Sequence, residues 1–123
     1  MKKILLAEDE EILRMLIVDT LEEDDYHVDE VQDGKEALKL LQNSHYDLVI
    51  IDYMMPVYSG IEVIEEVRQG GMNERVTILM LSANSQLSEQ EKAMNAGADY
   101  FMAKPFSPKQ LSEKVRGIVH ENK

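Results

Sequence analysis

The sequence predicts an α/β fold: a doubly wound, five-stranded parallel sheet with five helices on its two faces. Strand-like apolar runs alternate with helix-like amphipathic segments along all 123 residues, which is the pattern of consecutive βα units. The run at 48–51 is continuously apolar, as in a central parallel strand covered on both faces. Right-handed crossovers between such strands place the helices on both sides of the sheet.

The first half of the chain supplies two strands, the second of them at an edge of the sheet, and two helices. Residues 4–7 form an apolar run, whereas residues 26–31 alternate with charged side chains, as in an edge strand with one wet face. Asp33 and Gly34 then turn the chain into a second helix. The apolar residues at helical spacing are Leu13, Leu16, Ile17 and Leu21 in the first helix, and Ala37, Leu38 and Leu41 in the second.

The middle of the chain predicts two more helices around a fourth strand at 76–81. A third helix starts at about Gly60, with Val63, Ile64 and Val67 inward, and ends before the Gly70-Gly71 pair. Ser88 and Glu91 have capping-box spacing, which predicts that Ser88 caps a short helix that Gly97 closes. Because only Ala93, Met94 and Ala96 are apolar there, we expect this helix to be weakly anchored.

A brief fifth strand and a capped helix complete the predicted domain, which we take as residues 1–123. Ser107 and Pro108 provide an N-cap and a proline at the first helical position. The helix places Leu111, Val115, Ile118 and Val119 inward. The expected strand order is 2-1-3-4-5, a flavodoxin-like arrangement whose switch point lies between the first and third strands.

Composition narrows the class of function. The 24 acidic and 13 basic residues give a net charge of −11, which argues against direct binding to nucleic acid or an anionic membrane surface. The absence of cysteine excludes a thiol nucleophile and fits a cytoplasmic protein. No apolar stretch is long enough to span a bilayer.

Polar residues end four of the apolar runs: Glu8 and Asp9, Asp52, Ser82 and Lys104. Because the carboxyl ends of parallel strands converge at one edge of the sheet, we expect these side chains to meet. Carboxylates held close together raise one another's pKa unless a cation lies between them, so the acidic trio predicts a divalent-metal site. The alternative is that Glu8, Asp9 and Glu10 only stabilise the start of the first helix. The full set of groups favours phosphoryl transfer.

Five short motifs, in order along the chain, together resemble a response-regulator receiver domain of two-component signalling. They are Glu8-Asp9; Asp52-Tyr53-Met54-Met55-Pro56 with Gly60 downstream; Ser82-Ala83; Gly97-Ala98-Asp99; and Lys104-Pro105-Phe106. The resemblance implies a phosphorylation-activated signalling switch that catalyses only its own phosphorylation and dephosphorylation. It also implies a sensor histidine kinase or phosphotransfer protein as partner, and a downstream protein or tethered domain as output.

The resemblance assigns chemical roles to the residues at the strand ends. Asp52 would accept the phosphoryl group from a phosphohistidine and form an aspartyl phosphate. Mg²⁺, or another divalent ion such as Mn²⁺, would be bound by Asp9, Asp52 and the Met54 backbone carbonyl, and by Glu8 through water. Lys104 would neutralise phosphoryl charge.

The resemblance also implies a switch and a means of tuning it. Ser82 would donate its hydroxyl to the phosphoryl group, and Phe101 would turn inward and alter the surface of the fourth helix, fifth strand and fifth helix. Phe101 as plain core filler remains an alternative. Asn84 would orient a hydrolytic water and Met54 would shield the phosphoryl group. The Lys104-Pro105 peptide bond is expected to be cis.

Three rival classes share part of this pattern. A haloacid-dehalogenase-type phosphatase also places an aspartate nucleophile after a strand, but it has a second aspartate where this chain has Met54. A flavin carrier needs a phosphate-binding loop after the first strand, where this chain is acidic. A pseudo-receiver, acting as a phosphorylation-independent protein-binding module, is disfavoured because every site residue type is present.

Overall fold

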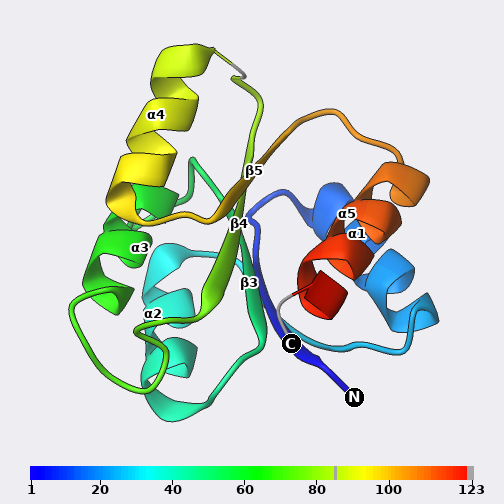
Figure 1. The fold of residues 1–123 in the computed structure, drawn as a ribbon, viewed down its shortest axis with the longest axis horizontal. Helices are drawn as coiled ribbons and strands as arrows, with labels where there is room; N and C mark the ends of the chain where they lie inside the picture. The colour runs from blue at the N-terminus through cyan, green and yellow to red at the C-terminus, as the bar shows by residue number, and fades with distance from the viewer. Residues whose placement is uncertain (85, 122–123) are drawn as a thin grey trace.

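The computed structural model describes residues 1–84 and 86–121, and its strands form one parallel sheet (Figure 1). The strand order is β2-β1-β3-β4-β5, as predicted. The strands are β1 (Lys3–Ala7), β2 (His27–Val31), β3 (Leu48–Asp52), β4 (Thr77–Ser82) and β5 (Tyr100–Ala103). The predicted domain of residues 1–123 includes residues 122–123, which lie outside the described residues.

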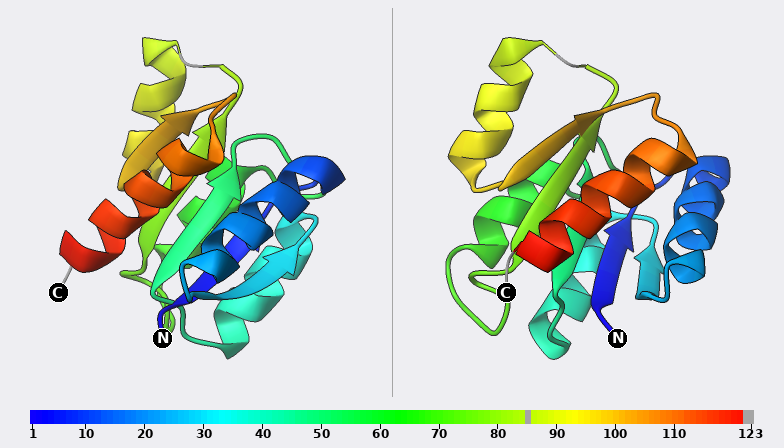
Figure 2. Two further views of the ribbon diagram at one scale, coloured as in Figure 1. Left: turned by 90° about the vertical axis from the view of Figure 1, so that its right-hand side faces the viewer. Right: turned by 45° about the vertical axis from the view of Figure 1, so that its right-hand side comes forward.

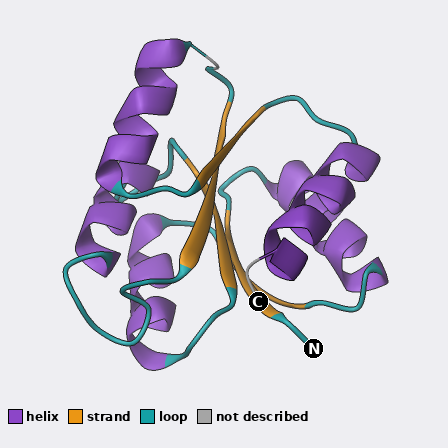
Figure 3. Ribbon diagram, viewed as in Figure 1, coloured by secondary structure: helices purple, strands orange, loops and turns teal. Residues whose placement is uncertain are grey.

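Helices alternate with the strands and cover both faces of the sheet (Figures 2 and 3). They are α1 (Glu11–Glu23), α2 (Gly34–Asn43), α3 (Gly60–Val67), α4 (Leu87–Ala96) and α5 (Pro108–Glu121). α2, α3 and α4 lie on one side, and α1 and α5 lie on the other (Figure 1). The predicted doubly wound α/β class is therefore confirmed. Every helix among the described residues is too short or too polar to cross a lipid bilayer.

The core has two halves because successive strand residues point to opposite faces of the sheet. In β3, Val49 and Ile51 pack towards α2, α3 and α4, whereas Leu48 and Ile50 pack towards α1 and α5. All four side chains are buried, as the continuously apolar run predicted. This close packing fixes the position of Asp52, the last residue of the strand.

The buried face of α1 differs from the one that the apolar spacing indicated. Its buried residues are Arg14, Ile17, Thr20 and Leu21, whereas Leu13 is half-buried and Leu16 is exposed. Arg14 can be buried because its guanidinium donates to the backbone carbonyl of Glu8 (2.9 Å) and to the carboxylate of Glu30 (3.1 Å). The buried face of α1 therefore includes a long charged side chain that the apolar spacing did not indicate.

The predicted start of α4 was wrong. The helix begins at Leu87, with Gln86 in the N-cap position and no side-chain cap, so Ser88 lies inside the first turn. The helix begins earlier than predicted because the Asn84 side chain accepts a hydrogen bond from the backbone amide of Gln86 (3.0 Å). This hydrogen bond holds Gln86 in an extended conformation. Ala93 is the only buried residue of the helix, so the thin apolar face was predicted correctly.

Other helix ends follow the sequence signals. Asp33 caps α2 by accepting from the Glu36 amide (2.8 Å), and Ser107 accepts from the Gln110 amide (3.1 Å) ahead of α5. Gly97 ends α4 with a φ of 123°. The capping box at the start of α3 joins Ser59 to Glu62 and was not predicted.

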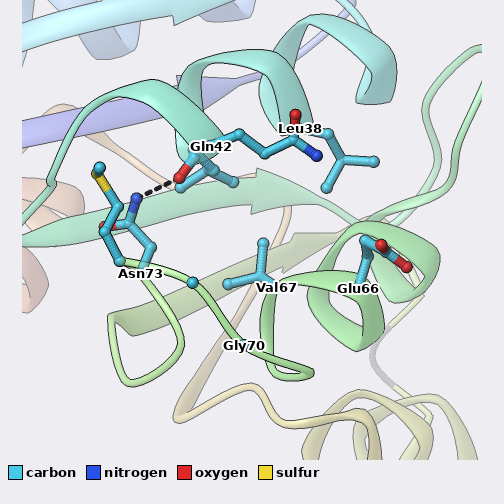
Figure 4. Close-up of a pocket in the computed structure, with 9 residues that line it drawn as sticks. Leu38, Gln42, Glu66, Val67, Gly70 and Asn73 are labelled. Atoms are coloured by element: carbon cyan, nitrogen blue, oxygen red, sulfur yellow. Dashed lines mark hydrogen bonds between the residues drawn. The ribbon is translucent and has the colours of Figure 1, made fainter.

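A hollow of about 150 Å³ lies between α2 and α3, far from the strand ends that carry the predicted site (Figure 4). Leu38 and Gln42 of α2 face Glu66 and Val67 of α3 across it. The buried Asn73 closes one end: its amide donates to the backbone carbonyl of Leu41 (2.6 Å) in the last turn of α2. Asn73 thus ties the loop before β4 to the end of α2.

Arg68 joins the turn before β4 to the turn between α4 and β5, and we expect Arg68→Ala to lower the free energy of unfolding by about 2–4 kcal/mol. Its guanidinium donates to the carbonyls of Glu74, Val76 and Gly97 and to the Asp99 carboxylate, at 2.7–3.1 Å. Urea denaturation measures the loss. The exposed Arg75→Ala is the control and should change stability by less than about 0.5 kcal/mol. Equal effects of the two substitutions would contradict this role for Arg68.

Candidate functional site

The structure brings the predicted polar residues to one edge of the sheet. Glu8 follows β1, Asp52 ends β3, Ser82 ends β4 and Lys104 follows β5. The register sets Asp52 beside Leu81 and Ser82 beside Ala103, so these strand ends are level. A pocket of about 270 Å³ opens there. It is lined by Asp52, Tyr53, Met54, Ser82, Ala83, Asn84, Glu89 and Lys104.

Lys104 lies between two buried carboxylates. Its Nζ is 2.7 Å from Asp52 Oδ2 and 3.0 Å from Glu8 Oε1. Burial lowers the pKa of the Lys104 ammonium, but its interactions with the Asp52 and Glu8 carboxylates outweigh burial, so the pKa is raised. The ammonium therefore remains charged, and its position fixes one oxygen of Asp52.

Glu8 carries the most deeply buried carboxyl group of the site. Its side chain is fully buried, and burial raises the pKa of the carboxyl from 4.5 to about 7. The hydrogen bond from the Glu10 amide lowers that pKa, and the Asp52 charge raises it further. Among the described residues, Glu8 Oε1 has no hydrogen-bond donor in suitable geometry, although the Lys104 ammonium is near. A buried carboxylate with an oxygen that accepts no hydrogen bond is stabilised by an additional cation.

The donor set fits a divalent cation. Carboxylate oxygens of Glu8, Asp9 and Asp52 all lie within 4.8 Å of one another. Asp9 is exposed, whereas the other two are buried, so the cluster opens to solvent on the Asp9 side. Hard oxygen ligands with room for water match the coordination that Mg²⁺ prefers.

The remaining predicted residues surround this cluster at different depths. Ser82 is buried, and its hydroxyl accepts from the Asn84 amide (3.1 Å). The Met54 amide lies 3.4 Å from Asp52 Oδ1, while the Met54 side chain is exposed. Phe101 is half-buried and packs against the core on the α2, α3 and α4 side, and it is not among the residues that line the pocket. The Lys104-Pro105 peptide bond is cis, as expected.

Three residues of the site were not predicted from the sequence. Arg14 binds the Glu8 backbone, and its place on a helix that packs mainly apolar residues inward was the available signal. Tyr53 and Glu89 line the pocket beside Asp52. Tyr53 follows Asp52 directly, but nothing in the sequence indicated that Glu89, 37 residues further on, faces the same space.

A doubly wound sheet with carboxylates and a lysine at its switch point is an arrangement suited to metal-assisted phosphoryl transfer. The family model of the response regulator receiver domain matches residues 4–116. The chain therefore belongs to the response regulator receiver domain family. It is a signalling module of two-component systems rather than a conventional enzyme.

Known relatives agree with this assignment. PhoB of Rhizobium meliloti, a phosphate regulon transcriptional regulatory protein, is 39% identical over 98% of this chain and 53% of its own length. This chain spans about half the length of the curated relatives that it matches. The Francisella response regulator 1452 receiver domain superposes with a TM-score of 0.91 at 30% identity, covering 100% of both chains. TrrA of Thermotoga maritima, solved with Mg²⁺ and BeF, has a TM-score of 0.83 at 37% identity, covering 96% of this chain and 99% of its own.

Proposed function

We propose that this domain is a switch that is turned on by phosphorylation of Asp52. One observation carries the proposal: Asp52 shares its site with two further carboxylates and holds Lys104 at 2.7 Å. In a receiver domain, a strand-end aspartate in this setting is the group best placed to receive a phosphoryl group. Its backbone is fixed by a buried strand, which limits the motion of the nucleophile.

The proposed reaction transfers a phosphoryl group without oxidation or reduction. An Asp52 carboxylate oxygen forms a bond to phosphorus, and the bond from phosphorus to the donor breaks. With a phosphohistidine donor the imidazole nitrogen keeps the electron pair and takes up a proton. Hydrolysis resets the switch, because water attacks phosphorus and the Asp52 carboxylate leaves, which yields inorganic phosphate.

Glu8, Asp9 and Asp52 are the side chains that would hold a divalent ion, with the Met54 carbonyl as a further ligand. We assign the ion as Mg²⁺, with Mn²⁺ as a substitute, because the donors are all oxygens. The ion supplies positive charge against the phosphoryl oxygens when it is bound. The magnesium complex of TrrA supports this assignment.

Lys104 and Ser82 are the groups that would act on the phosphoryl oxygens. The Lys104 ammonium lies beside Asp52 Oδ2 and would neutralise charge as the new bond forms. Ser82 lines the same pocket, and its hydroxyl would donate to a phosphoryl oxygen. In doing so Ser82 would change its contact with the Asn84 amide, so the loop after β4 would move. Phe101 would follow that movement as the switch residue.

Met54 and Asn84 are proposed to set the lifetime of the phosphorylated state. Both side chains are exposed at the mouth of the pocket. The side-chain amide of Asn84 would orient the attacking water, and the Met54 side chain would limit access of water to phosphorus. The partners follow from the family: a sensor histidine kinase or phosphotransfer protein as donor, and a downstream protein or attached domain as output.

The first test is the intact mass of the protein after incubation with acetyl phosphate and Mg²⁺. We expect a gain of one phosphoryl group in the wild-type chain. In this reaction the Asp52 carboxylate displaces acetate, which leaves with the electron pair of the broken bond. Asp52→Asn should show no gain, because an amide is a far weaker nucleophile than a carboxylate.

Two controls separate the site from general reactivity. Chelation of the metal should abolish the gain in mass, and Asp47→Asn should react as the wild type does, because Asp47 precedes β3 at the opposite end of the strand. A gain that persists in Asp52→Asn, or that does not need a divalent metal, would contradict the proposed chemistry.

A further inference from the structure

Glu89 places a negative charge on the wall of the pocket that would receive the phosphoryl group. It belongs to the first turn of α4, which begins shortly after β4 ends at the site (Figure 1). Its side chain is 19% exposed and lines the pocket together with Asp52, Ser82 and Lys104. Glu89 is thus the pocket-lining residue through which α4 contacts the site.

The Glu89 carboxylate also joins α4 to the loop after β3. Tyr53 lines the same pocket as Glu89, and burial followed by the interaction with the Glu89 carboxylate raises the pKa of Tyr53. Lys92 Nζ lies 3.7 Å from Glu89 Oε1, but the lysine side chain is 66% exposed. That ion pair is screened by solvent and neutralises the carboxylate only weakly.

A phosphoryl group on Asp52 would bring close to two negative charges into the same space. We propose that electrostatic repulsion between this group and the Glu89 carboxylate couples phosphorylation to α4: Glu89 opposes occupancy of the site, and occupancy displaces Glu89 from Tyr53. This inference rests on the proposed function and concerns its regulation. Because coupling is reciprocal, a protein in which α4 has lost the Glu89 contact binds an anion at the Asp52 site more tightly.

The anchoring of α4 determines which of its ends responds. Its C-terminal end is held by Arg68, which donates two hydrogen bonds to the carbonyl of Gly97 (3.1 and 2.7 Å). Its N-terminal end has no side-chain cap, and Ala93 is the only buried residue of the helix. Release of Glu89 from Tyr53 therefore frees the N-terminal turn, residues 87–90, while the other end stays fixed.

Beryllium fluoride with Mg²⁺ is the probe, because it occupies a phosphoryl site as an anion at equilibrium and needs no turnover. We expect Glu89→Gln to lower the concentration for half-occupancy by roughly tenfold, since it removes the negative charge and keeps the size of the side chain. Glu91→Gln removes a charge from the same helix at an exposed position outside the pocket and should bind as the wild type does.

Amide hydrogen exchange of residues 87–90 supplies a second measurement. In the wild type, beryllium fluoride should speed exchange there several-fold. Tyr53→Phe, which keeps the aromatic ring but cannot donate to Glu89, should show raised exchange before the anion is added. Equal half-occupancy in Glu89→Gln and Glu91→Gln would overturn the inference and leave Glu89 only a helix-stabilising role. Failure of the wild type to bind beryllium fluoride or to react with acetyl phosphate would instead overturn the proposed function.

Discussion

Glu8→Gln should make the metal-free protein more stable than the wild type at pH 8, by as much as about 3 kcal/mol. The Glu8 carboxyl is fully buried and shares the site with the carboxylate of Asp52. Its pKa is raised by burial to about 7. Above that pH the folded protein must hold a buried charge, whereas glutamine has almost the same shape and no charge.

The direction of the pH dependence follows from the raised pKa. Between pH 4.5 and 7 the folded state binds the Glu8 proton more tightly than the unfolded state does, so stability falls as the pH rises through this window. Above pH 7 the carboxyl is ionised in both states and the contribution becomes constant. The difference between Glu8→Gln and the wild type should therefore be small at pH 4 and largest at pH 8.

Urea denaturation in the presence of a chelator, at pH 4, 6 and 8, measures this difference. Glu65→Gln is the matched control, because Glu65 is exposed on α3 and its replacement should shift all three values equally. Mg²⁺ at pH 8 should stabilise the wild type more than Glu8→Gln, since a bound cation compensates the buried charge. A Glu8→Gln difference that does not depend on pH would show that Glu8 is not the buried charge described above.

The site was predictable from the sequence because strand ends are simple to recognise. Asp52 and Ser82 follow buried apolar runs, and parallel strands bring such ends together whatever the distance between them in the sequence. The strand order was also predictable, because short connections and right-handed crossovers allow only a few topologies for consecutive βα units. The prediction of Lys104 as a site residue also required the resemblance to a family, because a single lysine after a short strand is common at protein surfaces.

Residues that act through long side chains were not predictable in this way. Arg14 occupies a buried position on α1 because Glu8 and Glu30 provide acceptors, and these partners come from two different strand ends. Glu89 lines the pocket from the first turn of α4, whose N-cap is Gln86, two residues before the Ser88 that the capping pattern selected. A local signal at Ser88 was overridden by the hydrogen bond between Asn84 and Gln86 in the preceding loop.

Gly60→Ala is expected to destabilise the protein by about 3 kcal/mol or more and to impair the site in the molecules that remain folded. Gly60 is the first residue of α3, and its amide donates to the carbonyl of Tyr53 (3.0 Å). A Cβ atom at this position would lie 2.3 Å from the backbone oxygen of Asp52 and 2.8 Å from Cε of Met80. The methionine can move, but the backbone of Asp52 belongs to the buried central strand. Relief of the clash must therefore move α3 or Asp52.

The opposite result is expected for Gly117→Ala, which provides the control. Gly117 lies within α5, and a Cβ there would meet nothing within 4 Å, so alanine should stabilise the protein by about 0.5–1 kcal/mol through helix propensity. Thermal unfolding of both variants gives the stabilities. The rate of reaction with acetyl phosphate, scaled to the folded fraction, reports the site, and it should fall only in Gly60→Ala. A stable Gly60→Ala that reacts at the wild-type rate would mean that α3 can shift without displacing Asp52, so the close approach of Gly60 would not be what positions the nucleophile.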